Sequence, residues 1–219
     1  MILFLGAPGS GKGTQSSRLS AQLGIPCLST GDMLRGEAKR NTARGRKLRG
    51  ILASGSLVDD SLVCAAVDAR LRRELPGNGI ILDGFPRTVA QANSLDSTLS
   101  DLGMGGPLVL HLDVPRERIV SRLTSRRLCP TCGTIFNLKS RPSWLGSYCE
   151  NDGALLMQRE DDTEAVILRR LKEFDRACAP LIKYYSRANY YRLDGDGDSE
   201  SVSAALLAIV GRTAGRAAA

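Results

Sequence analysis

The chain has 219 residues, of which 42% are hydrophobic and 24% charged, and its formal net charge is +7. This balance is typical of a folded globular protein, and no apolar run approaches the length of a membrane span, which excludes disordered and membrane-embedded classes. The positive charge favours anionic partners such as nucleotides. The opening MILFL is too short for the core of an export signal, so we expect a cytoplasmic protein with reduced thiols and no membrane partner. Nothing in the sequence demands more than a monomer.

The first predicted strand, residues 1–5, leads directly into the glycine-rich sequence GAPGSGKGTQ, residues 6–15. Its glycines let main-chain N–H groups approach an anion, Lys12 adds a positive charge, and the following helix directs its positive dipole end to the same place. The spacing G-x4-G-K is typical of a phosphate-binding P-loop. Gly13 stands where Ser or Thr is expected, so the pattern predicts phosphate binding and leaves direct Mg²⁺ ligation by Thr14 open.

Strands and helices are expected to alternate along the chain. Short apolar runs predict strands at residues 1–5, 27–29, 79–83, 107–113 and 190–193. Helical spacing predicts one helix that ends near residue 23 and four that cover about 61–74, 115–127, 163–187 and 199–210. Further helices are expected to begin near residues 30 and 87. This alternation predicts an α/β fold whose parallel sheet is covered on both faces and joined by right-handed crossovers.

Asp83 ends the third predicted strand and is followed by GFPRT, residues 84–88. Ligands bind at the carboxyl edge of a parallel sheet, where Asp83 can organise Mg²⁺ and its waters and where the turn projects Arg87. Gln91 lies four residues beyond Arg87, so we expect both on one side of the helix that begins there. An arginine for a phosphate and an amide for a purine edge predict a nucleotide bound lengthwise.

Three cysteines and one aspartate have the spacing of a metal site. Cys129 and Cys132 form a CxxC knuckle, and Cys149 and Asp152 repeat its spacing after sixteen intervening residues, as in zinc ribbons. Four protein ligands leave no open position, so the predicted Zn²⁺ is structural and stabilises a segment too poor in apolar residues to fold alone. Glu150 in place of Asp152, and iron in place of zinc, are the alternatives.

Arginines flank this irregular segment on both sides. Phosphoryl transfer requires from a protein chiefly alignment, positive charge around the moving group and exclusion of water. A segment hinged at arginines would act as a lid that delivers this charge. The arginines before it are Arg122, Arg126 and Arg127, and those after it are Arg159, Arg169 and Arg170.

These features together resemble the adenylate kinase family. The likeness runs from residue 1 to about residue 210 and rests on GAPGSGKGTQ (6–15), STGDMLR (29–35), DGFPRT (83–88) with Gln91, LDVP (112–115), and the spacing from the REDD motif (159–162) to Arg170. The resemblance implies a P-loop nucleoside monophosphate kinase fold, with a five-stranded parallel sheet flanked by helices and with AMP-binding and LID insertions. It divides the chain into a CORE (1–28, 59–124 and 163–219), an AMP-binding domain (29–58) and a LID with the zinc site (125–162).

The resemblance also implies a reaction: reversible transfer of a phosphoryl group from Mg-bound ATP to AMP, giving two ADP, in adenine nucleotide homeostasis. The implied ATP-binding residues are Gly9, Ser10, Gly11, Lys12, Gly13, Thr14, Arg126, Ile135, Phe136 and Gly197. The implied AMP-binding residues are Thr30, Arg35, Ser56, Leu57, Val58, Gly84, Phe85, Pro86, Arg87, Gln91, Arg159 and Arg170. The implied catalytic cations are Lys12, Arg87, Arg126, Arg159 and Arg170.

Two other functions share some of these features. UMP/CMP kinases have the same glycine loop but a short lid, so the long cysteine-bearing segment argues against them. A zinc ribbon on a basic protein can bind nucleic acid. This ribbon has one tryptophan and few neighbouring aromatic residues to stack bases, and its arginines suit a triphosphate better. We therefore predict ATP, AMP and ADP as partners and no nucleic acid.

Overall fold

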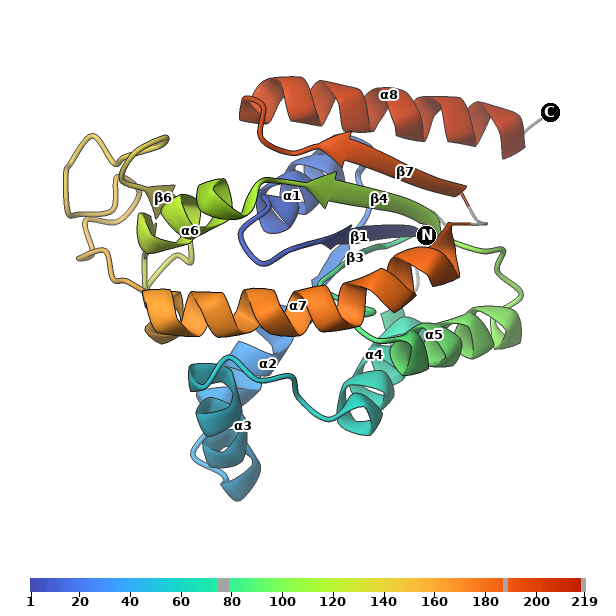
Figure 1. The fold of residues 1–219 in the computed structure, drawn as a ribbon, viewed down its shortest axis with the longest axis horizontal. Helices are drawn as coiled ribbons and strands as arrows, with labels where there is room; N and C mark the ends of the chain where they lie inside the picture. The colour runs from blue at the N-terminus through green and yellow to red at the C-terminus, as the bar shows by residue number, and fades with distance from the viewer. Residues whose placement is uncertain (75–78, 187–188, 218–219) are drawn as a thin grey trace.

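The computed structural model describes residues 1–74, 79–186 and 189–217 (Figure 1). Its strands are β1 (Ile2–Gly6), β2 (Cys27–Ser29), β3 (Ile81–Asp83), β4 (Leu108–Asp113), β5 (Arg126–Leu128), β6 (Ile135–Asn137) and β7 (Asn189–Asp194). Its helices are α1 (Lys12–Leu23), α2 (Thr30–Ala38), α3 (Ala43–Ala53), α4 (Asp60–Glu74), α5 (Val89–Asp101), α6 (Arg116–Thr124), the short η1 (Glu160–Asp162), α7 (Glu164–Tyr185) and α8 (Ser199–Ala217). Among these described helices, none combines the length and apolar character needed to cross a membrane.

Five strands form one parallel sheet in the order β2-β3-β1-β4-β7. Ile2 of the central strand β1 pairs with Ile81 of β3 on one side and with Leu108 of β4 on the other. The chain order reverses beside β1, and ligands of such sheets bind at the carboxyl ends of the strands next to that reversal. The predicted α/β fold with a five-stranded parallel sheet is confirmed.

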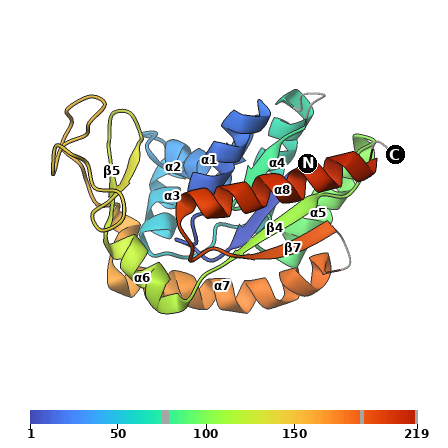
Figure 2. The ribbon, with the colours of Figure 1, turned by 90° about the horizontal axis from the view of Figure 1, so that it is seen from above.

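The strand side chains alternate between two hydrophobic cores. Leu3 and Leu82 pack with residues of α4, α5 and α7, whereas Phe4 and Ile81 pack with residues of α1 and α8. Figure 1 shows α7 and α8 on opposite sides of the sheet, and Figure 2 looks down on α8. Because both faces are covered, the strands are continuously apolar, which made them recognisable in the sequence.

Between β2 and α4 the chain forms an arm of two helices, α2 and α3, that extends away from the sheet (Figure 1). The sequence predicted one helical region that opens near residue 30, but Thr42 begins a second helix by accepting a hydrogen bond from the N–H of Gly45 at 3.0 Å. A Cβ on Gly45 would lie 2.3 Å from the carbonyl oxygen of Arg40, so the two helices meet where only glycine fits.

The helix expected over residues 115–127 ends at Thr124, and that expectation was wrong at its C-terminal end. Residues 126–128 instead form β5, which pairs antiparallel with β6 across the CxxC knuckle. Residues 125–162, called the cysteine segment below, contain this hairpin and turns, and they project at one end of the molecule (Figures 1 and 2). Of the expected helix over 163–187, α7 covers Glu164–Tyr185, and residue 187 lies outside the described residues.

Candidate active site and metal centre

Glycines with left-handed backbone angles shape the loop between β1 and α1. Gly9 and Gly11 have φ values of 84° and 96°, which residues with a Cβ rarely adopt. Gly11 is the N-cap of α1, and no side chain of the described residues caps this helix, which leaves its first N–H groups to an anion. The ammonium of Lys12 donates to the carbonyl oxygens of Gly6 at 2.7 Å and Ala7 at 2.8 Å and so lies over the loop.

Asp83 closes β3 directly beside this loop. A Cβ on Gly13 would lie 3.4 Å from Oδ2 of Asp83, so the carboxylate faces the start of α1. Burial raises the pKa of Asp83, and the charges of Lys12 and Arg87 oppose that rise. A carboxylate and an ammonium at the carboxyl edge of the sheet suit the Mg²⁺ and the phosphates of one nucleotide.

The turn at Gly84 brings two side chains to one carbonyl oxygen. Oγ1 of Thr30 donates to the oxygen of Gly84 at 2.9 Å, and Nε of Arg87 donates to the same atom at 2.8 Å. Gly84 has a φ of 78°, and a Cβ there would lie 3.1 Å from Oγ1 of Thr30 and 3.2 Å from Nη2 of Arg87. The next peptide bond, Phe85–Pro86, is cis. This turn fixes Arg87 at the predicted edge of the sheet, with its side chain exposed.

Arg35 extends from α2 into the same region and donates from Nη2 to Oδ1 of Asp32 at 2.6 Å. Burial acts to raise the pKa of Asp32, but the hydrogen bond and the charge of Arg35, together with smaller contributions from Ser29 and Arg159, outweigh it, and the net shift is downward. Desolvation within the site is the largest cause that lowers the pKa values of Arg87 and Arg159, and the charge of Arg35 contributes to both shifts. These three predicted cations therefore act on one another within one site.

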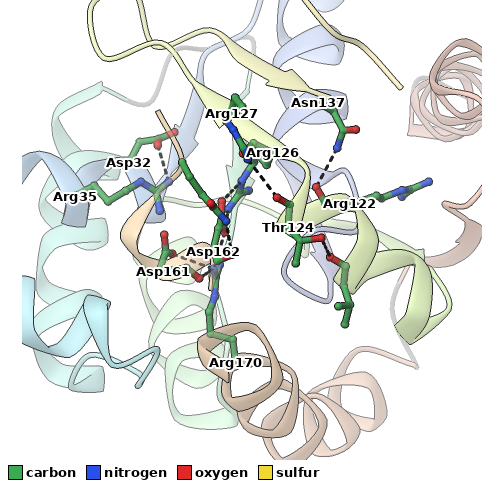
Figure 3. Close-up of polar contacts among 12 residues, drawn as sticks. Asp32, Arg35, Arg122, Thr124, Arg126, Arg127, Asn137, Asp161, Asp162 and Arg170 are labelled. Atoms are coloured by element: carbon green, nitrogen blue, oxygen red, sulfur yellow. Dashed lines mark hydrogen bonds and ion pairs between the residues drawn. The ribbon is translucent and has the colours of Figure 1, made fainter. Parts of the chain in front are cut away.

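Two neighbouring acids, Asp161 and Asp162, hold two further arginines. Asp162 is 0% exposed, and its carboxylate accepts from Nε of Arg126 at 2.7 Å and from Nη2 at 2.5 Å. Nη1 of Arg170 lies 2.9 Å from Oδ2 of Asp161 and 3.5 Å from Oδ1 of Asp162. Figure 3 shows these four side chains converging where the cysteine segment joins α7. Sequence reasoning gave the acids no role, although an acidic pair among arginines was a readable signal.

Arg159 has no such acceptor. Within the described part of the chain, its buried Nε lacks any hydrogen-bond partner. Burial, followed by the charge of Arg126, lowers the pKa of Arg159 to about 10. A buried donor without a partner is destabilising, and phosphate oxygens are the acceptors that match a guanidinium.

The sequence predicted that Gln91 and Arg87 share a helix, and this was wrong. Arg87 precedes Thr88, the N-cap of α5, and so lies outside the helix that carries Gln91. The two residues are joined instead by a bond from the main-chain N–H of Arg87 to Oε1 of Gln91, at 2.7 Å. Nε2 of Gln91 donates to Oδ1 of Asp60 at 2.7 Å. Sequence reasoning missed Asp60, whose only signal is an acid at the first residue of a helix.

The turn after α3 contains Ser56–Val58, in which Ser56 is exposed and Val58 is buried. The preceding Gly55 contacts α7. A Cβ on Gly55 would lie 2.9 Å from Cγ1 of Val166 and 3.0 Å from Cγ of Arg170. The predicted AMP-binding turn therefore lies against the helix that carries a predicted catalytic arginine.

The residues predicted beside the ATP base lie on β6 and in the loop after β7. Ile135 is 38% exposed, whereas the ring of Phe136 is 1% exposed within the core of the cysteine segment, so the two face opposite sides of β6. Gly197 is exposed in the loop after β7. The main-chain oxygen of Gly195, in the same loop, accepts from Nη1 of Arg122 at 3.0 Å. This bond connects α6 to the end of β7.

The four predicted metal ligands come together. The sulfur atoms of Cys129, Cys132 and Cys149 and a carboxylate oxygen of Asp152 all lie within 4.8 Å of one another. Sγ of Cys129 is 3.2 Å from Oδ2 of Asp152, and Sγ of Cys132 is 3.6 Å from Sγ of Cys149. A zinc tetrahedron with bonds of about 2.3 Å to sulfur and about 2.0 Å to oxygen has edges of about 3.5 to 3.8 Å, so the donor set fits Zn²⁺.

The surroundings of the cluster support the same ligand set. Main-chain N–H groups at both knuckles donate to a cysteine sulfur at 3.4 Å. The N–H of Ala154 is the largest of the causes that lower the pKa of Asp152 to about 2, so this carboxylate is ionised as a ligand must be. Glu150, the alternative ligand, instead lies 3.4 Å from Arg141.

Known proteins resemble the chain over nearly its whole length. The model of the family described as "Adenylate kinase" matches residues 4–190. A protein named adenylate kinase from a Geobacter species is 43% identical over 210 residues, covering 95% of this chain and 98% of the relative. One of the same name from Anaeromyxobacter dehalogenans is 40% identical over 213 residues, covering 97% and 100%. Together with the P-loop and the arginines gathered at the sheet edge, these matches show that the chain belongs to the adenylate kinase family.

Proposed function

We propose that this site holds ATP and AMP end to end and transfers the γ-phosphoryl group between them. The reaction of the family converts ATP and AMP into two ADP, which keeps the adenine nucleotides in balance. An oxygen of the AMP phosphate forms a bond to the γ-phosphorus, while the bond from that phosphorus to the bridging oxygen of ATP breaks. The attacking oxygen is already anionic, so the protein supplies alignment and positive charge rather than a general base.

On the ATP side, the loop N–H groups and Lys12 would bind the phosphates, and Mg²⁺ would arrive with ATP beside Asp83. Arg126 would contact the transferring group, and Ile135 would flank the base, with Phe136 contributing only main-chain atoms because its ring is buried. The full proposed set is Gly9, Ser10, Gly11, Lys12, Gly13, Thr14, Arg126, Ile135, Phe136 and Gly197.

On the AMP side, Arg35 and Arg87 would bind the phosphate, and Gln91 would bind the base. Arg159 and Arg170 would reach both nucleotides at the junction. The full proposed set is Thr30, Arg35, Ser56, Leu57, Val58, Gly84, Phe85, Pro86, Arg87, Gln91, Arg159 and Arg170.

The unpartnered Nε of Arg159 is the observation that carries this proposal. It lies among cations whose repulsion, together with burial, lowers its pKa, so a polyanion placed there gains both an unused donor and relief of that repulsion. Asp161 and Asp162 hold Arg170 and Arg126 in place, and their charges do not outweigh the causes that lower the pKa of Arg159. Such preorganised charge stabilises the transition state without reorganisation during the reaction.

We further propose that the cysteine segment is a LID (125–162) that closes over the site, with a CORE (1–28, 59–124 and 163–219) and an AMP-binding domain (29–58). Zn²⁺ held by Cys129, Cys132, Cys149 and Asp152 would cross-link the LID and take no part in the transfer. Thiolate ligands persist in a reducing compartment, which favours a cytoplasmic location. Both nucleotide sites are built from one chain, which favours a monomer.

Chromatographic quantification of ADP, after incubation with Mg-ATP and each of AMP, GMP, UMP and CMP, tests this proposal. We expect ADP from AMP and little product from the pyrimidine monophosphates. Lys12→Met should lower kcat by about a hundredfold or more, because a charge on the transferring phosphates is lost. Lys172→Met, the same change at an exposed lysine of α7, should keep wild-type kcat. A wild-type protein that forms no ADP from AMP would contradict the proposal.

A further inference from the structure

The side-chain amide of Gln91 is held at both ends by groups that each have a single hydrogen-bonding role. Oε1 accepts from the main-chain N–H of Arg87, and Nε2 donates to the carboxylate of Asp60, both at 2.7 Å. A main-chain N–H only donates, and a carboxylate only accepts. The network therefore fixes one of the two flipped orientations of the amide, with its oxygen toward Arg87 and its nitrogen toward Asp60.

Asp60 is itself fixed by Thr88. The hydroxyl of Thr88 donates to Oδ2 of Asp60 at 2.6 Å and accepts from the main-chain N–H of Gln91 at 3.2 Å. Both oxygens of Asp60 thus act as acceptors, and the first residue of α4 is connected to the first turn of α5. In a flipped amide, the oxygen of Gln91 would face this carboxylate and its NH2 group would face an N–H donor, so both hydrogen bonds would be lost.

The fixed amide keeps one lone pair on Oε1 and one proton on Nε2 for a ligand. Adenine carries a 6-amino donor beside an acceptor ring nitrogen, which matches an oxygen beside an N–H. Hypoxanthine and guanine carry an oxygen at position 6, which would face Oε1 across a repulsive contact. The orientation of the Gln91 amide therefore distinguishes 6-amino from 6-oxo purines.

We propose that Asp60 determines the choice of acceptor by holding Gln91 in the orientation that fits a 6-amino purine and opposes a 6-oxo purine. Asp60 is a positioning residue, because it acts through Gln91 and makes no contact with the nucleotide itself. The inference rests on the proposed function, in which Gln91 binds the base of AMP.

The test compares AMP with IMP, which differ at position 6, as acceptors at saturating Mg-ATP. In Asp60→Asn, an amide that can both donate and accept replaces the carboxylate, so only the main-chain N–H of Arg87 still opposes the flip of Gln91. We expect the ratio of kcat/KM for AMP to that for IMP to fall by about tenfold or more, because the discrimination depends on an oriented amide. The KM for ATP should not change.

Asp59→Asn is the matched control, because Asp59 bonds to Ser61 and to the N–H of Leu62 at the start of α4 and not to Gln91. Asparagine caps a helix as well as aspartate does, so the acceptor ratio should stay at the wild-type value. If the role of Asp60 is purely structural, Asp60→Asn lowers kcat/KM equally for both acceptors and leaves their ratio unchanged. That result would overturn the inference.

Thermal melting checks that Asp60→Asn is folded. Should it not fold, Asp60→Ser takes its place, since a hydroxyl also donates or accepts, and the same fall in the ratio is expected. A wild-type enzyme that does not phosphorylate AMP contradicts the proposed function. A wild-type enzyme that does, with an acceptor ratio unchanged in the folded variant, contradicts only the assignment of Asp60.

Discussion

Arg126 and Asp162 form a two-point ion pair that joins the first strand of the cysteine segment to η1 at its other end. The carboxylate is fully buried and the Arg126 side chain is 15% exposed, so little water screens the pair. The same carboxylate lies 3.5 Å from Nη1 of Arg170. One acid thus sets the positions of two arginines that come from different parts of the chain.

Asp162→Asn should lower the free energy of unfolding by about 3–5 kcal/mol, because removing one partner of a buried pair leaves the other charge uncompensated. Urea denaturation measures this change. Asp175→Asn is the control, since Asp175 pairs with Arg116 at 3.2 Å on the surface and should contribute only about 0–1 kcal/mol. An equal loss of unfolding free energy in the two variants would show that the buried pair stabilises the protein no more than the surface pair does.

Gly84→Ala should raise the KM for AMP as well as lower stability. The added Cβ crowds Thr30 and Arg87 at a φ of 78°, with a strain of about 1–3 kcal/mol. Gly103→Ala is matched in backbone strain, at a φ of 66°, but no heavy atom of the described chain lies within 4 Å of its added Cβ. It should lose stability and keep its KM for AMP. The same KM in both variants would exclude a role for the Gly84 turn in AMP binding.

The lowered pKa of Arg159 predicts a pH dependence of stability in alkaline solution. Burial and the charge of Arg126 place the pKa at about 10, well below the ordinary value of an arginine, so the folded protein loses this proton first. Between these values the unfolded chain binds more protons, and the contribution of Arg159 to stability therefore rises with pH. Below pH 10 the residue is charged in both states, and its contribution is constant.

Comparison with Arg159→Met isolates the contribution of Arg159 to stability, because the other groups that titrate above pH 10 are common to both proteins. The free energy of unfolding of the wild type, relative to that of the variant, should increase from pH 10 to 12. The slope should be at most 2.303RT per pH unit, which corresponds to a difference of one bound proton. A relative stability that falls over this range would contradict the burial of a charged Arg159.

Cys129→Ser should release zinc and lower the melting temperature by several degrees, because one of four ligands is lost from a segment with a small apolar core. Plasma mass spectrometry of the purified protein measures the metal content. Cys64→Ser, in α4 outside the cluster, should keep one zinc per chain. Equal metal content in the two variants would remove Cys129 from the ligand set.

The glycine loop, the central strands and the cysteine knuckles were predictable because their signals are local. Ile2 to Leu5 form a continuous apolar run, and the glycines that follow are needed wherever a backbone surrounds a phosphate. The CxxC spacing likewise depends on a few adjacent residues. Such features need no knowledge of distant partners.

The parts that were mispredicted depend on contacts between distant residues. Arg126 and Arg127 have the composition of a helix end, but their pairing with residues 136 and 137 beyond the knuckle makes them a strand. Asp60 and Asp162 gained their roles from partners about 30 residues away in the sequence. No periodicity of the sequence encodes such partners, so only the folded chain could reveal them.

The bend at Gly55 has a mechanical consequence. It rests on Val166, one turn of α7 before Arg170, at a separation too small for even one methyl group. The end of the two-helix arm is therefore packed directly against the helix that carries Arg170. If the arm binds AMP as proposed, a displacement of the arm on binding would be transmitted through this contact to Arg170.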